Sequence, residues 1–169
     1  MTAEELSQLE EENGRHELVK GKLLTLPFLS VEHGSILATA MAILGQHIKS
    51  NNLGVALARS GFKLESDPDT VLGPNMSFIS RERVGIVTDD YYSGPPDLAV
   101  ELISSTTEGR AKADQWLSFG TQSVWLIDSR MRTVEVFHAD GKRWLFQEHD
   151  ELVDNTVPGF RVAVSEIFS

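Results

Sequence analysis

The stretch "PPDLAVELISSTTEGRAKADQW", residues 95–116, decides how the chain folds, because it joins an apolar strand to a helix. Its first part, "DLAVELIS", is almost continuously apolar apart from two acids, which is typical of a central strand covered on both faces. Residues 108–120 follow with helical spacing, and the apolar run at residues 124–129 predicts another buried strand. This order of elements predicts a mixed α/β fold.

The two acids of this strand, Asp97 and Glu101, raise the question of what stabilises them. Side chains alternate along a strand, so both acids share one face, but their Cα atoms are roughly 13 Å apart, too far to hold one ion together comfortably. Burying an unpaired charge is costly, so Glu101 needs a partner from a neighbouring strand, expected at Asn75, or an ion pair with Arg59. For Asp97 the alternative is a carboxylate at the strand start that accepts local backbone N–H groups.

The rest of the chain can be divided into elements around this strand. With no repeat or linker, we expect one domain, residues 1–169, with the core order helix, three strands, helix, strand and added hairpins at both ends. The expected elements are a helix at 3–12, a hairpin at 16–26, a helix at 31–50, a strand at 55–65, a turn at 67–74, a strand at 75–80, a loop at 81–96, a hairpin at 133–147 and a closing segment at 160–168.

Composition excludes several classes of function. The chain has no cysteine, which excludes disulfides, thiolate catalysis and Cys-ligated metal centres and fits a cytoplasmic location. No apolar run is long enough to cross a membrane. The net charge of −10 argues against loose adhesion to nucleic acid, so a DNA partner requires a local basic patch. No phosphate-binding glycine loop, HExxH zinc motif or nucleophile elbow is present.

Several segments, in order, carry a resemblance to a known family: "HELVKGKL", "EHGSILATAMAILGQHI", "GFKLESDPDTVLGPNMSFISRERV" and "PPDLAVELISSTTEGRAKADQWLSFGTQSVWLIDS". Together they resemble the Uma-type family of putative restriction endonucleases, a branch of the PD-(D/E)XK nuclease superfamily. The resemblance covers nearly the whole chain and implies a restriction endonuclease-like fold. It also implies DNA cleavage that depends on magnesium or manganese, by a homodimer.

The resemblance also implies roles for individual residues. Glu101 matches the acid of the third core strand, and Asp97 matches the aspartate of the family's "PDL" motif. Glu17 matches a recurrent acid that completes the site. Lys112, on the following helix, matches the lysine that stabilises charge or orients water. Metal ligation is expected from Asp97, Glu101 and Asn75.

Asn75 departs from the family pattern, which has aspartate at this position. An asparagine can still offer a carbonyl oxygen but removes one negative charge from the site, so metal binding and activity are expected to weaken. The alternative is a non-catalytic descendant that binds nucleic acid or another partner. Without the family, Lys112 is equally well explained as a surface lysine, and His33, in the first turn of its helix, favours a structural role.

Overall fold

The centre of the molecule is a mixed six-stranded sheet, seen in a computed structural model that describes residues 1–10 and 14–169. Strands β8 and β9 run parallel, whereas every other neighbouring pair in this sheet is antiparallel. From one edge to the other, the order is β11 (Arg143–Phe146), β10 (Thr133–His138), β9 (Ser123–Asp128), β8 (Leu98–Ile103), β6 (Met76–Ser80) and β3 (Gly54–Ala58).

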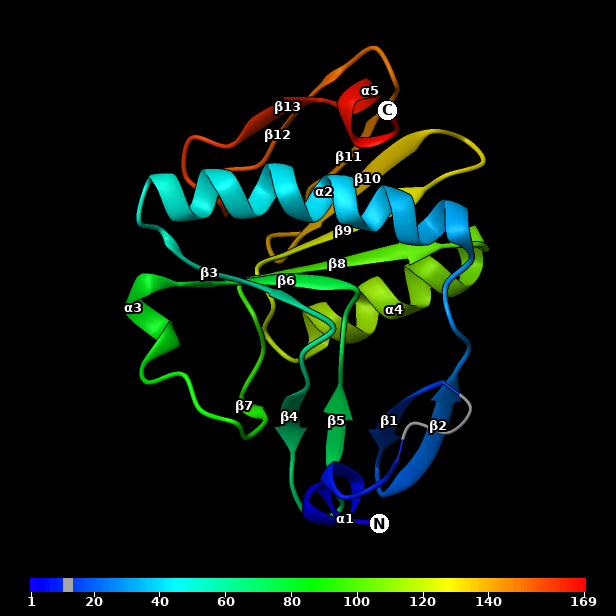
Figure 1. The fold of residues 1–169 in the computed structure, drawn as a ribbon, viewed down its shortest axis with the longest axis vertical. Coiled ribbons are helices and arrows are strands. Elements are labelled where there is room, and N and C mark those ends of the chain that lie inside the picture. Colours follow the sequence, from blue (N-terminus) through cyan, green and yellow to red (C-terminus); the bar gives the residue numbers. More distant parts are fainter. Residues whose placement is uncertain (11–13) are drawn as a thin grey trace.

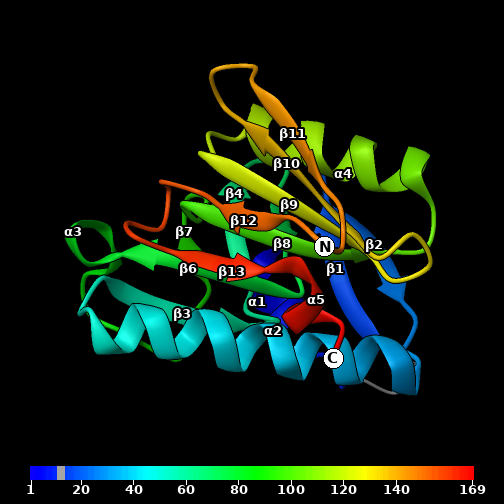
Figure 2. The same ribbon diagram turned by 90° about the horizontal axis from the view of Figure 1, so that it is seen from above.

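Two long helices cover the opposite faces of this sheet (Figures 1 and 2). Helix α2 (Val31–Ser50) packs on the face that carries Leu98 and Val100, and helix α4 (Thr106–Ser118) packs on the face that carries Ala99 and Ile103. Strand β8 is therefore buried on both sides, as its apolar sequence predicts. No helix in the described part of the chain is long and apolar enough to span a membrane.

The helices begin and pack where their sequences indicate. Ser30 caps α2 by accepting a hydrogen bond from the His33 backbone N–H at 3.1 Å, and Ser105 caps α4 by accepting one from Glu108 N–H at 3.4 Å. The buried face of α2 has the spacing of three or four residues that an amphipathic helix requires, and it consists of Ile36, Leu37, Ala40, Leu44 and Ile48.

Smaller elements surround this core. A second sheet lies below the first in Figure 1, next to α1 and the N-terminus, and a short two-stranded sheet lies near the C-terminus. The second sheet has the order β2 (Lys22–Leu26), β1 (Arg15–Val19), β5 (Thr70–Leu72), β4 (Phe62–Glu65) and β7 (Tyr92–Ser93). The other elements are β12 (Glu151–Val153), β13 (Arg161–Ala163), α1 (Ala3–Ser7), α3 (Arg81–Val84) and α5 (Val164–Ile167).

The predicted core order is confirmed: α2, then β3, β6 and β8, then α4 and β9, with hairpins β1–β2 and β10–β11 added. The strand expected at 55–65 was wrong, because the chain breaks at Arg59, whose φ is 52°, and continues as β4 in the other sheet. The segment at 67–74 contains β5 as well as a turn, and the loop at 81–96 contains α3 and β7. Helix α1 ends at Ser7, and residues 11 and 12 of the expected first helix lie outside the described residues.

Candidate active site

Glu101 is held by two side chains of helix α4. It points to the α4 face of β8, where its side chain is only 2% exposed. Its Oε1 accepts a hydrogen bond from Trp116 Nε1 at 3.0 Å, and its Oε2 lies 3.5 Å from Lys112 Nζ. Lys112 and Trp116 are four residues apart and so project from the same face of the helix. The alternative of an ion pair between Glu101 and an arginine such as Arg59 is not borne out, because Lys112 is the cation beside Glu101.

Glu17 joins this group from strand β1 of the second sheet. Its buried Oε1 accepts hydrogen bonds from Gly73 N–H at 3.0 Å and from Arg15 Nη2 at 3.4 Å. Burial raises the pKa of Glu17, the positive charges of Lys112 and Arg15 oppose this rise, and the negative charge of Glu101 adds to it. Glu17, Glu101 and Lys112 therefore interact electrostatically although they come from three different elements.

Asn75 lies directly before β6, in the strand register next to Glu101. Met76 pairs with Val100, which places Asn75 beside the Glu101 position on the neighbouring strand. The Asn75 Oδ1 accepts a hydrogen bond from Leu102 N–H at 2.8 Å, so its amide has a defined orientation. The expectation that the segment starting at Asn75 forms the neighbouring strand is confirmed.

Asp97 is not brought to the other four residues. It lies at the opposite end of β8, where its Oδ2 accepts a hydrogen bond from Ser80 N–H at 2.7 Å and its Oδ1 pairs with Arg83 Nη1 at 2.9 Å. Because Ser80 is the residue before α3, this carboxylate anchors the start of that helix. Asp97 therefore lies at the strand start, as the alternative has it, but its partners are Ser80 and Arg83 of another segment and not local backbone N–H groups.

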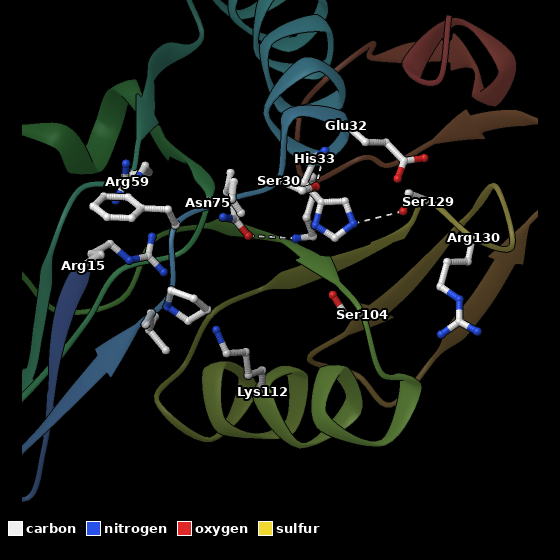
Figure 3. A pocket seen from close by; sticks show the side chains of 15 residues that line it. Arg15, Ser30, Glu32, His33, Arg59, Asn75, Ser104, Lys112, Ser129 and Arg130 are labelled. Atoms are coloured by element: carbon white, nitrogen blue, oxygen red, sulfur yellow. Dashed lines mark hydrogen bonds between the residues drawn. The ribbon is translucent and has the colours of Figure 1, made fainter. Parts of the chain in front are cut away.

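A cavity of about 510 Å³ borders this group at Asn75 and Lys112, whereas Glu17 and Glu101 are not among the residues that line it (Figure 3). Asn75 and Lys112 line it, together with the start of α2, the segment between β2 and α2, and the end of β9. Its lining carries one acid, Glu32, against four basic side chains: Arg15, Arg59, Lys112 and Arg130. In a chain with a net charge of −10, this cavity is the local basic patch that an anionic partner requires.

His33 also lines the cavity, and sequence reasoning gave it only a structural role. Its Nε2 lies 3.0 Å from Ser129 Oγ, a contact that links the start of α2 to the end of β9 (Figure 3). Sequence reasoning also missed Arg15, Trp116 and Arg130. The spacing of Arg15 to Glu17 could have indicated that both lie on one face of β1.

The family model for Uma2, described as "Putative restriction endonuclease", matches residues 3–165. The chain belongs to the Uma2 family. Among solved structures, this Uma2 chain is similar to "a putative nuclease belonging to DUF820 from Anabaena variabilis", with a TM-score of 0.82 and 20% sequence identity over 99% of this chain and 97% of that one. At this identity the match establishes a shared fold. No curated protein matches the chain.

Two carboxylates and one amide oxygen are the donors that this Uma2 site offers to a metal. The described residues contain no group of three His, Cys, Asp or Glu side chains placed to hold an ion. Magnesium, however, is bound through one or two carboxylates with waters and substrate phosphates completing its shell. Both hydrogen bonds to Glu17 within the described residues go to Oε1, which leaves Oε2 for a further ligand. The oxygen donor set therefore fits a hard divalent cation.

Proposed function

We propose that this Uma2 protein is a DNA endonuclease that requires magnesium or manganese and acts at the end of the cavity where Glu17, Asn75, Glu101 and Lys112 gather. The observation that carries the proposal is this gathering from four separate elements beneath a basic cavity. Phosphodiester hydrolysis requires oxygen ligands for a cation and positive charge for the phosphate. The site combines both in a chain that is otherwise strongly acidic.

Each residue of the site has a distinct role in this proposal. Glu101 and Glu17 would hold the metal together with the Asn75 oxygen, and a metal bound there would supply charge neutralisation and make hydroxide available near neutral pH. Trp116 fixes the Glu101 carboxylate through its indole N–H, and this orients the ligand. Lys112, with about a third of its side chain exposed, can turn from Glu101 toward a phosphate.

Three arginines extend the positive surface beyond the metal ligands. Arg15, Arg59 and Arg130 line the same cavity and would contact phosphates of the DNA strand on either side of the cleaved bond. One such site cuts one strand, so we further propose that a homodimer supplies the second site for cleavage of a duplex.

A second candidate is nucleic-acid binding without cleavage, which one feature of the site favours. Each carboxylate already has a cationic neighbour, Arg15 for Glu17 and Lys112 for Glu101, while Asn75 supplies no charge. The site is therefore charge-balanced without a metal, and the arginines of the cavity could hold phosphates in the same way.

Incubation of the wild-type protein with supercoiled plasmid separates these candidates. We expect conversion to nicked and linear DNA in magnesium or manganese and none in excess EDTA. Gel retardation of a short duplex under EDTA measures binding independently. Binding without cleavage in either metal would support the second candidate, and neither binding nor cleavage would reject both.

A further inference from the structure

One phenylalanine at the cavity is exposed, unlike the other phenylalanines of the chain. The chain has eight phenylalanines, all within the described residues, and seven of them are buried or partly buried. The exception is Phe28, which is 65% exposed and lines the basic cavity. An exposed aromatic side chain beside a functional cavity is a feature of binding surfaces, because apolar area in water is unfavourable unless a ligand covers it.

The backbone presents Phe28 in a constrained position. Strand β2 ends at Leu26 and the cap of α2 is Ser30, so only three residues connect two regular elements. The first of these is Pro27, whose ring restricts the backbone angle φ before Phe28. The short connection therefore limits the backbone entropy that is lost when a ligand packs on the ring.

The charge around Phe28 indicates the chemistry of that ligand. Arg15, Arg59, Lys112 and Arg130 line the same cavity, so the ligand carries several negative charges as well as a flat apolar surface. A nucleic-acid strand combines both, since phosphates bind to Arg and Lys while bases stack on aromatic rings. A second copy of this acidic chain could also supply negative charge, so the oligomeric state is one outcome of the test below.

We propose that Phe28 is a stacking platform for a nucleobase of the strand that enters the cavity. The inference rests on the proposed function for the identity of the ligand and extends it to the form of the substrate. A base inside a duplex is stacked on its neighbours and its faces are not available. The strand in the cavity is therefore unpaired at the base that stacks on Phe28, as in a single strand or a locally opened duplex, and its phosphates lie on the arginines.

Binding of two fluorescent oligonucleotides of about 15 nucleotides tests this proposal without any cleavage. One is oligothymidine, and the other carries abasic sugars throughout and keeps the same phosphates. Anisotropy titrations in EDTA use the wild type, Phe28→Ala, Phe28→Trp, Arg59→Gln and the control Val31→Ala. Val31 is 93% exposed and apolar but does not line the cavity.

We expect the wild type to bind oligothymidine about tenfold more tightly than the abasic strand. Phe28→Ala should remove this difference, Phe28→Trp should retain it, and Val31→Ala should leave both affinities unchanged. Arg59→Gln should weaken both oligonucleotides by the same factor, because it affects only a phosphate contact.

Other outcomes overturn the proposal in distinguishable ways. Equal wild-type affinity for the two strands excludes base stacking and leaves the endonuclease proposal intact. If Phe28→Ala weakens the binding of both oligonucleotides equally, the ring only shapes the cavity and does not stack on a base. The wild type could instead sediment as a dimer and Phe28→Ala as a monomer, with the base preference unchanged. That result would mean that Phe28 contacts a second copy of the chain. No binding of either strand by the wild type rejects the proposed function as well.

Discussion

Replacement of Glu101 by glutamine tests how the buried carboxylate is held. Removing one partner of a fully buried ion pair costs about 3–5 kcal/mol, because the remaining charge loses its compensation. Lys112 keeps about a third of its side chain in water and can rehydrate, and the glutamine oxygen can still accept from Trp116 Nε1. We therefore expect a loss of only about 1–2 kcal/mol in the free energy of unfolding.

Urea unfolding followed by tryptophan fluorescence measures this loss, and thermal unfolding should show a midpoint lowered by about 3–6 °C. Lys112→Met and the double variant provide the control, because the double variant should lose less than the sum of the two single variants if the ion pair is the cause. A Glu101→Gln protein as stable as the wild type, or more stable, would refute the reasoning. That result would mean that repulsion between Glu17 and Glu101 outweighs the pairing with Lys112.

Two further predictions concern charge in the same group. For Glu17→Gln, the melting temperature of the variant minus that of the wild type should become more positive as pH rises from about 4 to 7. The reason is that the raised pKa of Glu17 makes the wild type lose stability once its carboxylate ionises, whereas glutamine does not ionise. Differential scanning calorimetry measures the two melting temperatures, and a difference that does not depend on pH would contradict this prediction. Asn75→Asp should bind magnesium about tenfold more tightly in calorimetric titrations, about 1.4 kcal/mol, and gain more thermal stability from added magnesium. Equal affinities for the two proteins would exclude Asn75 as a position that limits metal binding.

Much of the core could be predicted because local patterns determine it. The nearly continuous apolar run marked β8 as a central strand despite its two acids. The spacing of Lys112 to Trp116 follows from the helix that comes next. The position of Asn75 beside Glu101 followed from the short apolar strand that begins there. These features depend on periodicity within one segment, which the sequence displays directly.

The remaining features depend on contacts between distant segments. The family resemblance implies that Asp97 and Glu101 belong to one site. Asp97, however, lies at the other end of the strand, where Arg83 and Ser80 bind it. The partner of Glu101 was expected at Asn75 or Arg59, but its cation is Lys112, which comes from the following helix. The left-handed backbone at Arg59 also left no signal, since nothing in its residue type requires it.

The central claim is that the Glu101 end of β8, and not the Asp97 end, is the site of DNA cleavage. Plasmid nicking in magnesium and in manganese by the wild type, Glu101→Gln and Asp97→Asn, each shown to be folded at the assay temperature, tests it most directly. We expect the wild type and Asp97→Asn to cleave at similar rates and Glu101→Gln to be slower by at least about a hundredfold. A folded Glu101→Gln protein that cleaves as fast as the wild type, or a wild type inactive with both metals, would contradict the account.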